Sequence, residues 1–415
     1  MNTLNQVVLN ERCLLGPDLD RWLAGPGGAG LATALAAPDR LISTIEAAGL
    51  RGMGGAGFPT HRKWSFVAAE TGRDQKYLIC NGNEDEPGTF KDRLLLEKSP
   101  HQVIEGALIA ALATGVNNVV MYINPAQTAS VENIGKAIAQ WLAHPLFGRL
   151  ESAIGRPMTL SLVESSGLYI GGEESAAIAS VEGGFPFPRR KPPYPAQSGV
   201  HGCPTLVNNI ETLANVPHII HHGADWYRAL GIGDAAGTKI YTLSGDVVAP
   251  GVYELPMGTS LRDLIEVHGQ GMLAGKRFKA VFTGGPSNTI LKKEDIDVAL
   301  DFDSVRKRRS SLGTGAMIVI SEETGIVKRV TDYVDFFAHS SCGQCPPCKI
   351  GTHQMARLLR KIDTGQGTRS DMNALINLCS VLPGSGRCAL IDGAVTVVNS
   401  SLDKFREEYE QQLIA

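Results

Sequence analysis

The stretch KYLICNGNEDEPGTFKDR, residues 76–93, joins a short apolar run to a polar turn rich in carboxylates. Lys76–Cys80 has the aliphatic composition of a buried strand, and a helix is expected from Arg93 onward. The polar turn therefore follows the carboxyl end of a strand, which is where parallel α/β sheets bind ligands. A second interpretation is a solvated loop that only caps the next helix through Thr89 or Asp92.

Strand-like and helix-like patterns alternate through the first half of the chain. Helices are expected over Arg40–Leu50, Pro59–Glu70, Arg93–Thr114 with a break at Pro100, and Ala126–Ala143. Further strands are expected over Asn118–Ile123 and Met158–Val163. This alternation predicts an α/β domain with a largely parallel sheet.

The pattern changes from Lys239 onward, where short β-rich runs surround one expected helix, Leu261–Gly269. The runs are Lys239–Leu243, Gly251–Glu254, Ala280–Thr283 and Met317–Ile320. Glycine and proline turns separate them, which predicts a small α+β domain. After Thr331 the pattern is helical to the end, so we divide the chain into residues 1–235, 236–328 and 329–415.

Composition and charge exclude several classes of protein. The 415 residues include 43% hydrophobic and 20% charged side chains, which is ordinary for a folded domain. A net charge of −3 gives no indication of nucleic-acid binding. The longest apolar stretch, Gly106–Ala113, falls short of the roughly 20 residues of a membrane-spanning helix. Met1–Gly16 has no secretion-signal pattern, so we expect a cytoplasmic protein without direct membrane insertion.

Three of the eight cysteines, Cys342, Cys345 and Cys348, form a C-x2-C-x2-C run. Clustered cysteines in a reducing compartment indicate a metal site, and three thiolates suit one face of a cubane cluster. Two later cysteines are candidates for the fourth ligand. Cys379 lies in a helical pattern, where cysteine commonly packs as a small hydrophobe, whereas Cys388 follows a flexible glycine-rich loop. We expect Cys388 to complete the cluster; a four-thiolate zinc site is the alternative.

A glycine-rich loop precedes the helix expected from Pro59. The sequence RGMGGAGFPT, residues 51–60, contains Gly52, Gly54, Gly55 and Gly57. Glycines allow backbone N–H groups to approach a phosphate or ring, and a helix N-terminus favours anions. The loop lacks both the strand-first Rossmann fingerprint and the P-loop lysine, so a plain turn is equally compatible. Tyr169–Glu174 similarly places two glycines and two carboxylates before an alanine-rich helix, where they also suit capping.

Six stretches resemble, in order, the NADH-binding flavoprotein subunit of respiratory complex I. They are Arg51–Trp64, Asn81–Arg93, Tyr169–Glu182, Lys191–Tyr194, Val207–Thr212 and Ser341–Gly351. The same module occurs in NAD-linked hydrogenases, formate dehydrogenases and related aldehyde-oxidising complexes. The resemblance extends from about Arg40 to Tyr409. It implies a Rossmann-like α/β domain for flavin and NAD(H), a ubiquitin-like β-grasp domain of the soluble-ligand-binding type, and a helical bundle with a [4Fe–4S] cluster.

The resemblance also implies the positions of the cofactors. FMN, with FAD as the alternative, would be surrounded by the glycine loop and by Lys63, Asn81, Asn83, Glu84, Tyr169, Gly172, Glu173, Asn208, Asn209 and Thr212. Phe58 and Phe66 would stack on the adenine side of NAD(H). Its polar groups would be held by Glu86, Glu174, Lys191 and Tyr194. The fourth cluster ligand of the family falls on Cys388.

Two positions depart from the family pattern beside the implied flavin. Met53 stands where arginine is usual, and Asn83 where aspartate is usual. These departures favour the NAD-reducing module of a hydrogenase or of a formate or aldehyde dehydrogenase over the complex I subunit itself. In either case hydride would pass between NAD(H) and flavin, and single electrons between flavin, cluster and iron–sulfur partner subunits. Glu86 and Glu174 are the residues expected to position the nucleotide for this catalysis.

Two further alternatives remain at this stage. The chain can be a non-enzymatic iron–sulfur scaffold that binds no flavin. It can also belong to an ion-pumping electron-transfer complex that shares the β-grasp and cluster types.

Overall fold

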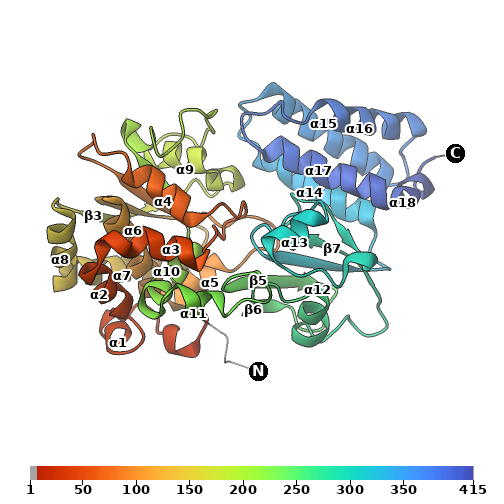
Figure 1. Ribbon diagram of the computed structural model, residues 1–415. Helices are drawn as coiled ribbons and strands as arrows, with labels where there is room; N and C mark the ends of the chain where they lie inside the picture. The colour runs from red at the N-terminus through yellow and green to blue at the C-terminus, as the bar shows by residue number, and fades with distance from the viewer. Residues whose placement is uncertain (1–6, 415) are drawn as a thin grey trace.

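A computed structural model describes residues 7–414 of the chain, which fold around two separate β-sheets and a C-terminal group of helices (Figure 1). Residues 1–6 are part of Met1–Gly16, the stretch without a secretion-signal pattern, and of the first predicted domain. Residue 415 is the last residue of the third predicted domain. These residues lie outside the described part of the chain.

The first sheet has four parallel strands in the order β3-β2-β1-β4. The strands are β1 (Tyr77–Gly82), β2 (Asn118–Ile123), β3 (Thr159–Glu164) and β4 (Thr205–Asn209). The chain therefore moves outward from β1 to β3 and then returns to the other side of β1. Asn81 at the end of β1 pairs in register with Asn209 at the end of β4. The predicted polar turn after β1 therefore lies next to the polar end of β4. The chain connections change direction between these two strands, and open α/β sheets usually bind ligands at such a position.

Helices surround this sheet, and the predicted parallel α/β architecture is confirmed. They are α1 (Leu19–Ala24), α2 (Ala29–Ala36), α3 (Leu41–Ala48), α4 (Thr60–Ala68), α5 (Asp92–Lys98), α6 (Pro100–Thr114), α7 (Thr128–Ala143), α8 (Pro145–Ile154), α9 (Glu174–Val181), α10 (Ile210–His222) and α11 (Ala224–Arg228). The expected break at Pro100 separates α5 from α6. Helix α6 is buried along almost its whole length and packs against α10. Their contact requires Gly106, because a Cβ there would lie 1.9 Å from the Leu213 carbonyl oxygen.

The second sheet has five strands in the order β6-β5-β9-β7-β8. These are β5 (Thr238–Gly245), β6 (Gly251–Pro256), β7 (Phe278–Thr283), β8 (Leu291–Lys292) and β9 (Ala316–Ser321). Only β5 and β9 pair in parallel; the other neighbours are antiparallel. The helix expected over Leu261–Gly269 is a short α-helix, α12 (Leu261–Asp263), that continues as a π-helical turn over Leu264–His268. One more helix, α13 (Phe302–Lys307), precedes β9.

The C-terminal part is helical, as predicted, and lies against the second sheet in Figure 1. Its helices are α14 (Ile326–Ser340), α15 (Pro346–Asp363), α16 (Arg369–Val381), α17 (Leu390–Lys404) and α18 (Arg406–Gln411). Helical structure begins at Ile326, slightly before the expected Thr331. Phe337, Met355 and Val398 are among the side chains of its apolar core. Among the helices within residues 7–414, none is both long and apolar enough to span a lipid bilayer.

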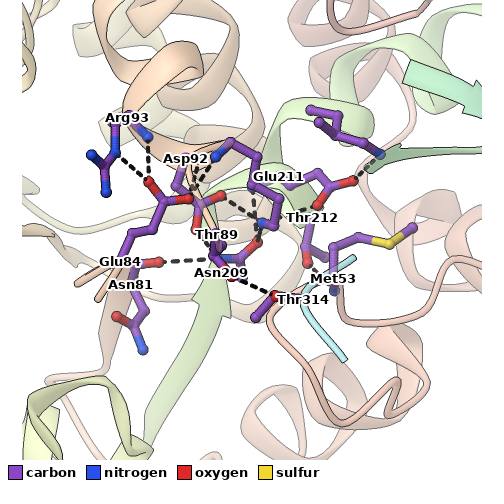
Figure 2. Close-up of polar contacts among 12 residues, drawn as sticks. Met53, Asn81, Glu84, Thr89, Asp92, Arg93, Asn209, Glu211, Thr212 and Thr314 are labelled. Carbon is purple, nitrogen blue, oxygen red and sulfur yellow. Dashed lines mark hydrogen bonds and ion pairs between the residues drawn. The ribbon is translucent and has the colours of Figure 1, made fainter. Parts of the chain in front are cut away.

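A buried ion network joins the two sheets (Figure 2). Glu211 on α10 lies 2.9 Å from the Lys91 ammonium nitrogen and also pairs with Lys239 on β5; all three side chains are 0% exposed. Glu211 Oε1 additionally accepts the backbone N–H of Ile240 at 2.8 Å. Burial alone would raise the pKa of Glu211, but the two ammonium groups lower it below its usual value. A buried charge is tolerated only when it is paired in this way, so the network fixes one sheet against the other.

We expect Lys239→Met to destabilise the protein by about 3 kcal/mol, because it leaves the buried Glu211 carboxylate with one cation fewer. The free energy of unfolding in urea measures the effect. Lys136→Met is the matched control: Lys136 forms an exposed pair with Glu132 at 2.6 Å, and its loss should cost less than about 1 kcal/mol. Equal losses in the two variants would contradict a structural role for the network.

Candidate functional site

A cleft of about 550 Å³ opens at the carboxyl end of the four-stranded sheet. All three parts of the chain line it, including Thr314 beside β9 and Gly393 on α17. Its size suits a small-molecule or cofactor site. The residues of the sequence predictions that line it are Gly54, Asn81, Asn83, Glu84, Glu86, Tyr169, Gly172, Glu173, Asn209 and Cys388. Lining residues that the sequence did not single out include Ile170, Ser287, Thr314, Phe337, Leu390, Gly393 and Thr396.

The glycine loop forms one wall of this cleft. Gly52 donates its N–H to the Phe58 carbonyl at 2.9 Å, which closes the loop. A Cβ at Gly54 would lie 2.9 Å from Cβ of Asn209, so only glycine allows this close approach to the end of β4. Of the four predicted glycines, Gly54 lines the cleft, whereas Gly52, Gly55 and Gly57 shape the loop around it.

The Met53 side chain of this loop packs in the core. The resemblance places Met53 beside the flavin, but its side chain is buried in the apolar core with 1% exposure and does not line the cleft. Its backbone N–H instead binds Thr212 Oγ1 at 2.8 Å. Thr212 therefore supports the loop from behind. Asn208 has a comparable position, since its Oδ1 accepts the Trp64 indole N–H at 2.9 Å and so fixes α4.

Three asparagine side chains connect the walls of the cleft. Asn81 donates through Nδ2 to the Gly172 carbonyl at 2.9 Å. Asn83 donates to the Leu168 carbonyl at 3.0 Å, and its Oδ1 accepts from Ser165. Asn209 caps α10, with Nδ2 also donating to Asp92 Oδ2 at 2.7 Å. These amides join the end of β1 to the segment before α9 and to α5, so they give the cleft a defined shape.

Glu84 directs its carboxylate toward the protein itself. Its Oε1 accepts the backbone N–H groups of Lys91 at 2.7 Å and Asp92 at 2.8 Å, and Oε2 accepts Arg93 Nε at 3.0 Å (Figure 2). Burial raises its pKa from the ordinary value. Glu84 thus closes the polar turn onto the first turn of α5, while its side chain also lines the cleft.

Glu86, two residues further along the same turn, also lines the cleft. Its Oε1 accepts the hydroxyl of Ser287 at 3.1 Å, and the nearby Tyr169 hydroxyl also favours the ionised form of the carboxylate. Burial raises the pKa of Glu86 to about 7. The Tyr169 ring contacts Phe336 and Phe337 of α14 edge-on, with centroids 5.2 and 6.1 Å apart. Glu86 therefore contacts the loop after β7 of the second sheet, and its pKa lies near neutrality.

A second group of predicted residues lies outside the cleft lining, around Glu174. Glu174 Oε2 pairs with Lys63 on α4 at 3.0 Å, and Oε1 pairs with Lys191. Burial alone would raise the pKa of Glu174, but these two ammonium groups lower it. The predicted aromatic residues are exposed: Phe58 by 38%, Phe66 by 49% and Tyr194 by 55%.

Exposed aromatic rings of this kind offer flat apolar surface to a planar ligand. The Arg62 guanidinium lies 5.9 Å and 6.0 Å from the Phe58 and Phe66 ring centroids. The predicted flavin and nucleotide residues thus form two groups, one inside the cleft and one on the surface beside α4.

Four thiols line a second, smaller cavity, which we call the cysteine cavity. They come from two segments: Cys342, Cys345 and Cys348 at the start of α15, and Cys388 just before α17. Cys379 is instead buried in the apolar core of the helical part, as expected for a packing residue. Within residues 7–414, no three His, Cys, Asp or Glu side chains are spaced to hold a single metal ion. The four-thiol set fits the ligands of a [4Fe–4S] cluster.

The cysteine cavity and the cleft share a wall. Ile170, Cys388 and Leu390 line both. Burial raises the pKa of Cys388 to about 12, and the nearby carboxylate of Glu173 and the thiols of Cys342 and Cys348 contribute to this rise. Cluster binding displaces protons from cysteine thiols, so it would be coupled to proton release here.

Three family models match the chain. The Nuo51 FMN-binding domain matches residues 45–218, the SLBB domain residues 240–291, and the NADH-ubiquinone oxidoreductase-F iron-sulfur binding region residues 328–412. A crystal structure of an NAD+-reducing [NiFe]-hydrogenase in the H2-reduced state superimposes with a TM-score of 0.84 and 36% identity. The match covers 96% of this chain and 67% of that chain.

Curated relatives match over most of their length. The F 2 subunit of the NADH-quinone oxidoreductase of Rhizobium meliloti is 42% identical over 393 residues, which cover 94% of this chain and 93% of that protein. The corresponding F subunit of Escherichia coli is 40% identical over 395 residues, covering 94% and 89%. Taken with the cleft and the cysteine cavity, these matches show that the chain belongs to the family of NADH-quinone oxidoreductase F subunits.

Proposed function

We propose that this chain is an NADH:acceptor oxidoreductase subunit. It moves hydride between NAD(H) and bound FMN, and single electrons between that flavin and a [4Fe–4S] cluster. The observation that carries the proposal is the shared wall: Ile170, Cys388 and Leu390 border both the cleft and the cysteine cavity. A flavin in the first and a cluster in the second would therefore be neighbours.

The cofactors would supply the redox chemistry, with flavin exchanging hydride or single electrons and the cluster single electrons. The side chains of the protein would hold the flavin and the nucleotide and orient them relative to each other. Gly54 lets the glycine loop pack against Asn209 at the end of β4, and Asn81, Asn83 and Asn209 fix the shape of the cleft that would hold the flavin. Glu174, held between Lys63 and Lys191, is proposed to bind the nucleotide beside Phe58, Phe66 and Tyr194. Such positioning is worth roughly 7–11 kcal/mol of barrier at most.

We further propose the domain boundaries 1–235, 236–328 and 329–415, with Rossmann-like and β-grasp assignments for the first two. The strand order β3-β2-β1-β4 supports the former, because it is the first part of the order typical of dinucleotide-binding folds. The mixed second sheet, with parallel β5 and β9 at its centre, supports the latter.

The proposed partners are iron–sulfur subunits of a larger redox complex. Cys342, Cys345 and Cys388 are only partly buried, so the cluster would lie near the surface, where an acceptor can approach. The NAD-reducing module of a hydrogenase or of a formate or aldehyde dehydrogenase, and the complex I subunit, are both compatible with the relatives. The cleft argues against a flavin-free scaffold. Eight unpaired cysteines support a cytoplasmic location.

Anaerobic titration with NADH tests this function. We expect the visible absorbance of the flavin to bleach first, followed by the electron paramagnetic resonance signal of a reduced cluster. Protein that contains the cluster but takes up neither FMN nor FAD on reconstitution, and does not respond to NADH, would support the scaffold instead.

Cys388→Ser should abolish the cluster while leaving flavin reduction by NADH, because it removes one of four cluster ligands but exchanges only a sulfur for an oxygen in the cleft wall. Iron content and the electron paramagnetic resonance signal of the cluster measure cluster loss, and bleaching of the flavin measures its reduction by NADH. Cys379→Ser is the control, since that buried thiol lies away from the cysteine cavity. If only Cys379→Ser lost the cluster, Cys379 would be the fourth cluster ligand and Cys388 would not.

Glu174→Ala should raise the KM for NADH about tenfold or more and leave FMN bound, because charge-assisted hydrogen bonds are worth about 1.5–3 kcal/mol. Steady-state kinetics and flavin content of the purified protein measure this. Glu132→Ala, which removes an exposed carboxylate on α7, is the control. Loss of flavin from the Glu174 variant would instead assign this carboxylate to the flavin.

A further inference from the structure

We propose that Ser287, in the loop after β7, is a positioning residue that holds the Glu86 carboxylate in the cleft. The second sheet would then take a direct part in nucleotide binding. This inference rests on the proposed function and on the role in binding polar groups of NAD(H) that the family resemblance implies for Glu86.

The loop that carries Ser287 is built to reach Glu86. Ser287 Oγ donates to Glu86 Oε1 at 3.1 Å, and both residues line the cleft. Gly285 has φ +90°, and a Cβ there would lie 2.5 Å from Glu86 Cγ. Only glycine therefore allows the loop to come this close. Asn288 fixes the loop through a separate bond, from its Nδ2 to the Thr283 carbonyl at 3.0 Å.

The helical part confines Ser287 from the other side. A Cβ built at Gly393 on α17 would lie 3.1 Å from Ser287 Cβ, closer than most side-chain contacts. Gly393 also lines the cleft. Ser287 is thus enclosed between the turn after β1 and α17, so its hydroxyl has little freedom to leave Glu86.

Two hydroxyl groups affect the state of this carboxylate. The hydroxyls of Ser287 and Tyr169 both favour the ionised form of Glu86, while burial and the neighbouring charge of Asp85 favour the protonated form. An ionised carboxylate only accepts hydrogen bonds, which is what a ribose hydroxyl or a carboxamide N–H requires. Removal of the Ser287 hydroxyl should therefore keep Glu86 protonated to higher pH and weaken its hold on the nucleotide near neutrality.

The experiment uses the holoprotein and the variants Ser287→Ala, Asn288→Ala, Glu86→Gln and Ser287→Ala/Glu86→Gln. The infrared carboxyl band that Glu86→Gln removes gives the protonation midpoint of Glu86 without any turnover. Equilibrium binding of NADH between about pH 5.5 and about 9 gives the affinity.

We expect Ser287→Ala to move the midpoint upward by about one pH unit and to weaken NADH binding at least threefold at about pH 7. Asn288→Ala, which alters the same loop without touching Glu86, should leave the midpoint unchanged. In the Glu86→Gln background, loss of Ser287 should have no further effect on NADH binding, whereas a general structural role would add to it.

The inference is overturned if Ser287→Ala leaves the midpoint in place, or if Asn288→Ala moves it equally. Failure of the proposed function gives a different result. In that case Glu86→Gln leaves NADH binding unchanged at every pH, while the infrared midpoint still responds to Ser287.

Discussion

The buried carboxylate of Glu211 is the constraint on which the rest of the structure depends. A carboxylate with no exposed surface needs cations around it, and here they come from different parts of the chain: Lys91 from the turn after β1 and Lys239 from the second sheet. One carboxylate thus has satisfactory partners only when the two sheets meet in a single arrangement. The cleft lies beside this junction, so its width follows from the same pairing.

Most of the secondary structure was predictable because its signals are local. Apolar runs gave the positions of β1, β2, β3 and the longer strands of the second sheet, and Pro100 gave the boundary between α5 and α6. Helix α2 was not predicted. Its alanine- and glycine-rich sequence has little amphipathic pattern, and it is fixed by Glu105, which accepts the N–H groups of Gly28 at 2.8 Å and Leu31 at 3.0 Å. A partner more than seventy residues away leaves no local signal.

The residues of the candidate site also separate into those with a local sequence signal and those without one. The polar turn after β1 and the four cysteines that line one cavity were found from spacing and from their place relative to strands and loops. Ser287 and Thr314 were missed, since a single hydroxyl in a turn looks like any solvated loop residue until folding brings it to the cleft. Met53 is a different case: it belongs to a recognised motif next to the implied flavin, but its side chain packs in the core, which the motif alone does not indicate.

Because three separate stretches of the chain line the cleft, the evolution of their sequences is constrained. A crossover that replaced only the helical part would import a foreign Leu390 and Gly393 into a cavity shaped by another protein's glycine loop. Because Gly393 on α17 packs closely against Ser287, substitutions in α17 would likewise require changes in the turn that contains Gly285 and Ser287. Substitutions in one of these three stretches are therefore expected to require matching substitutions in the others.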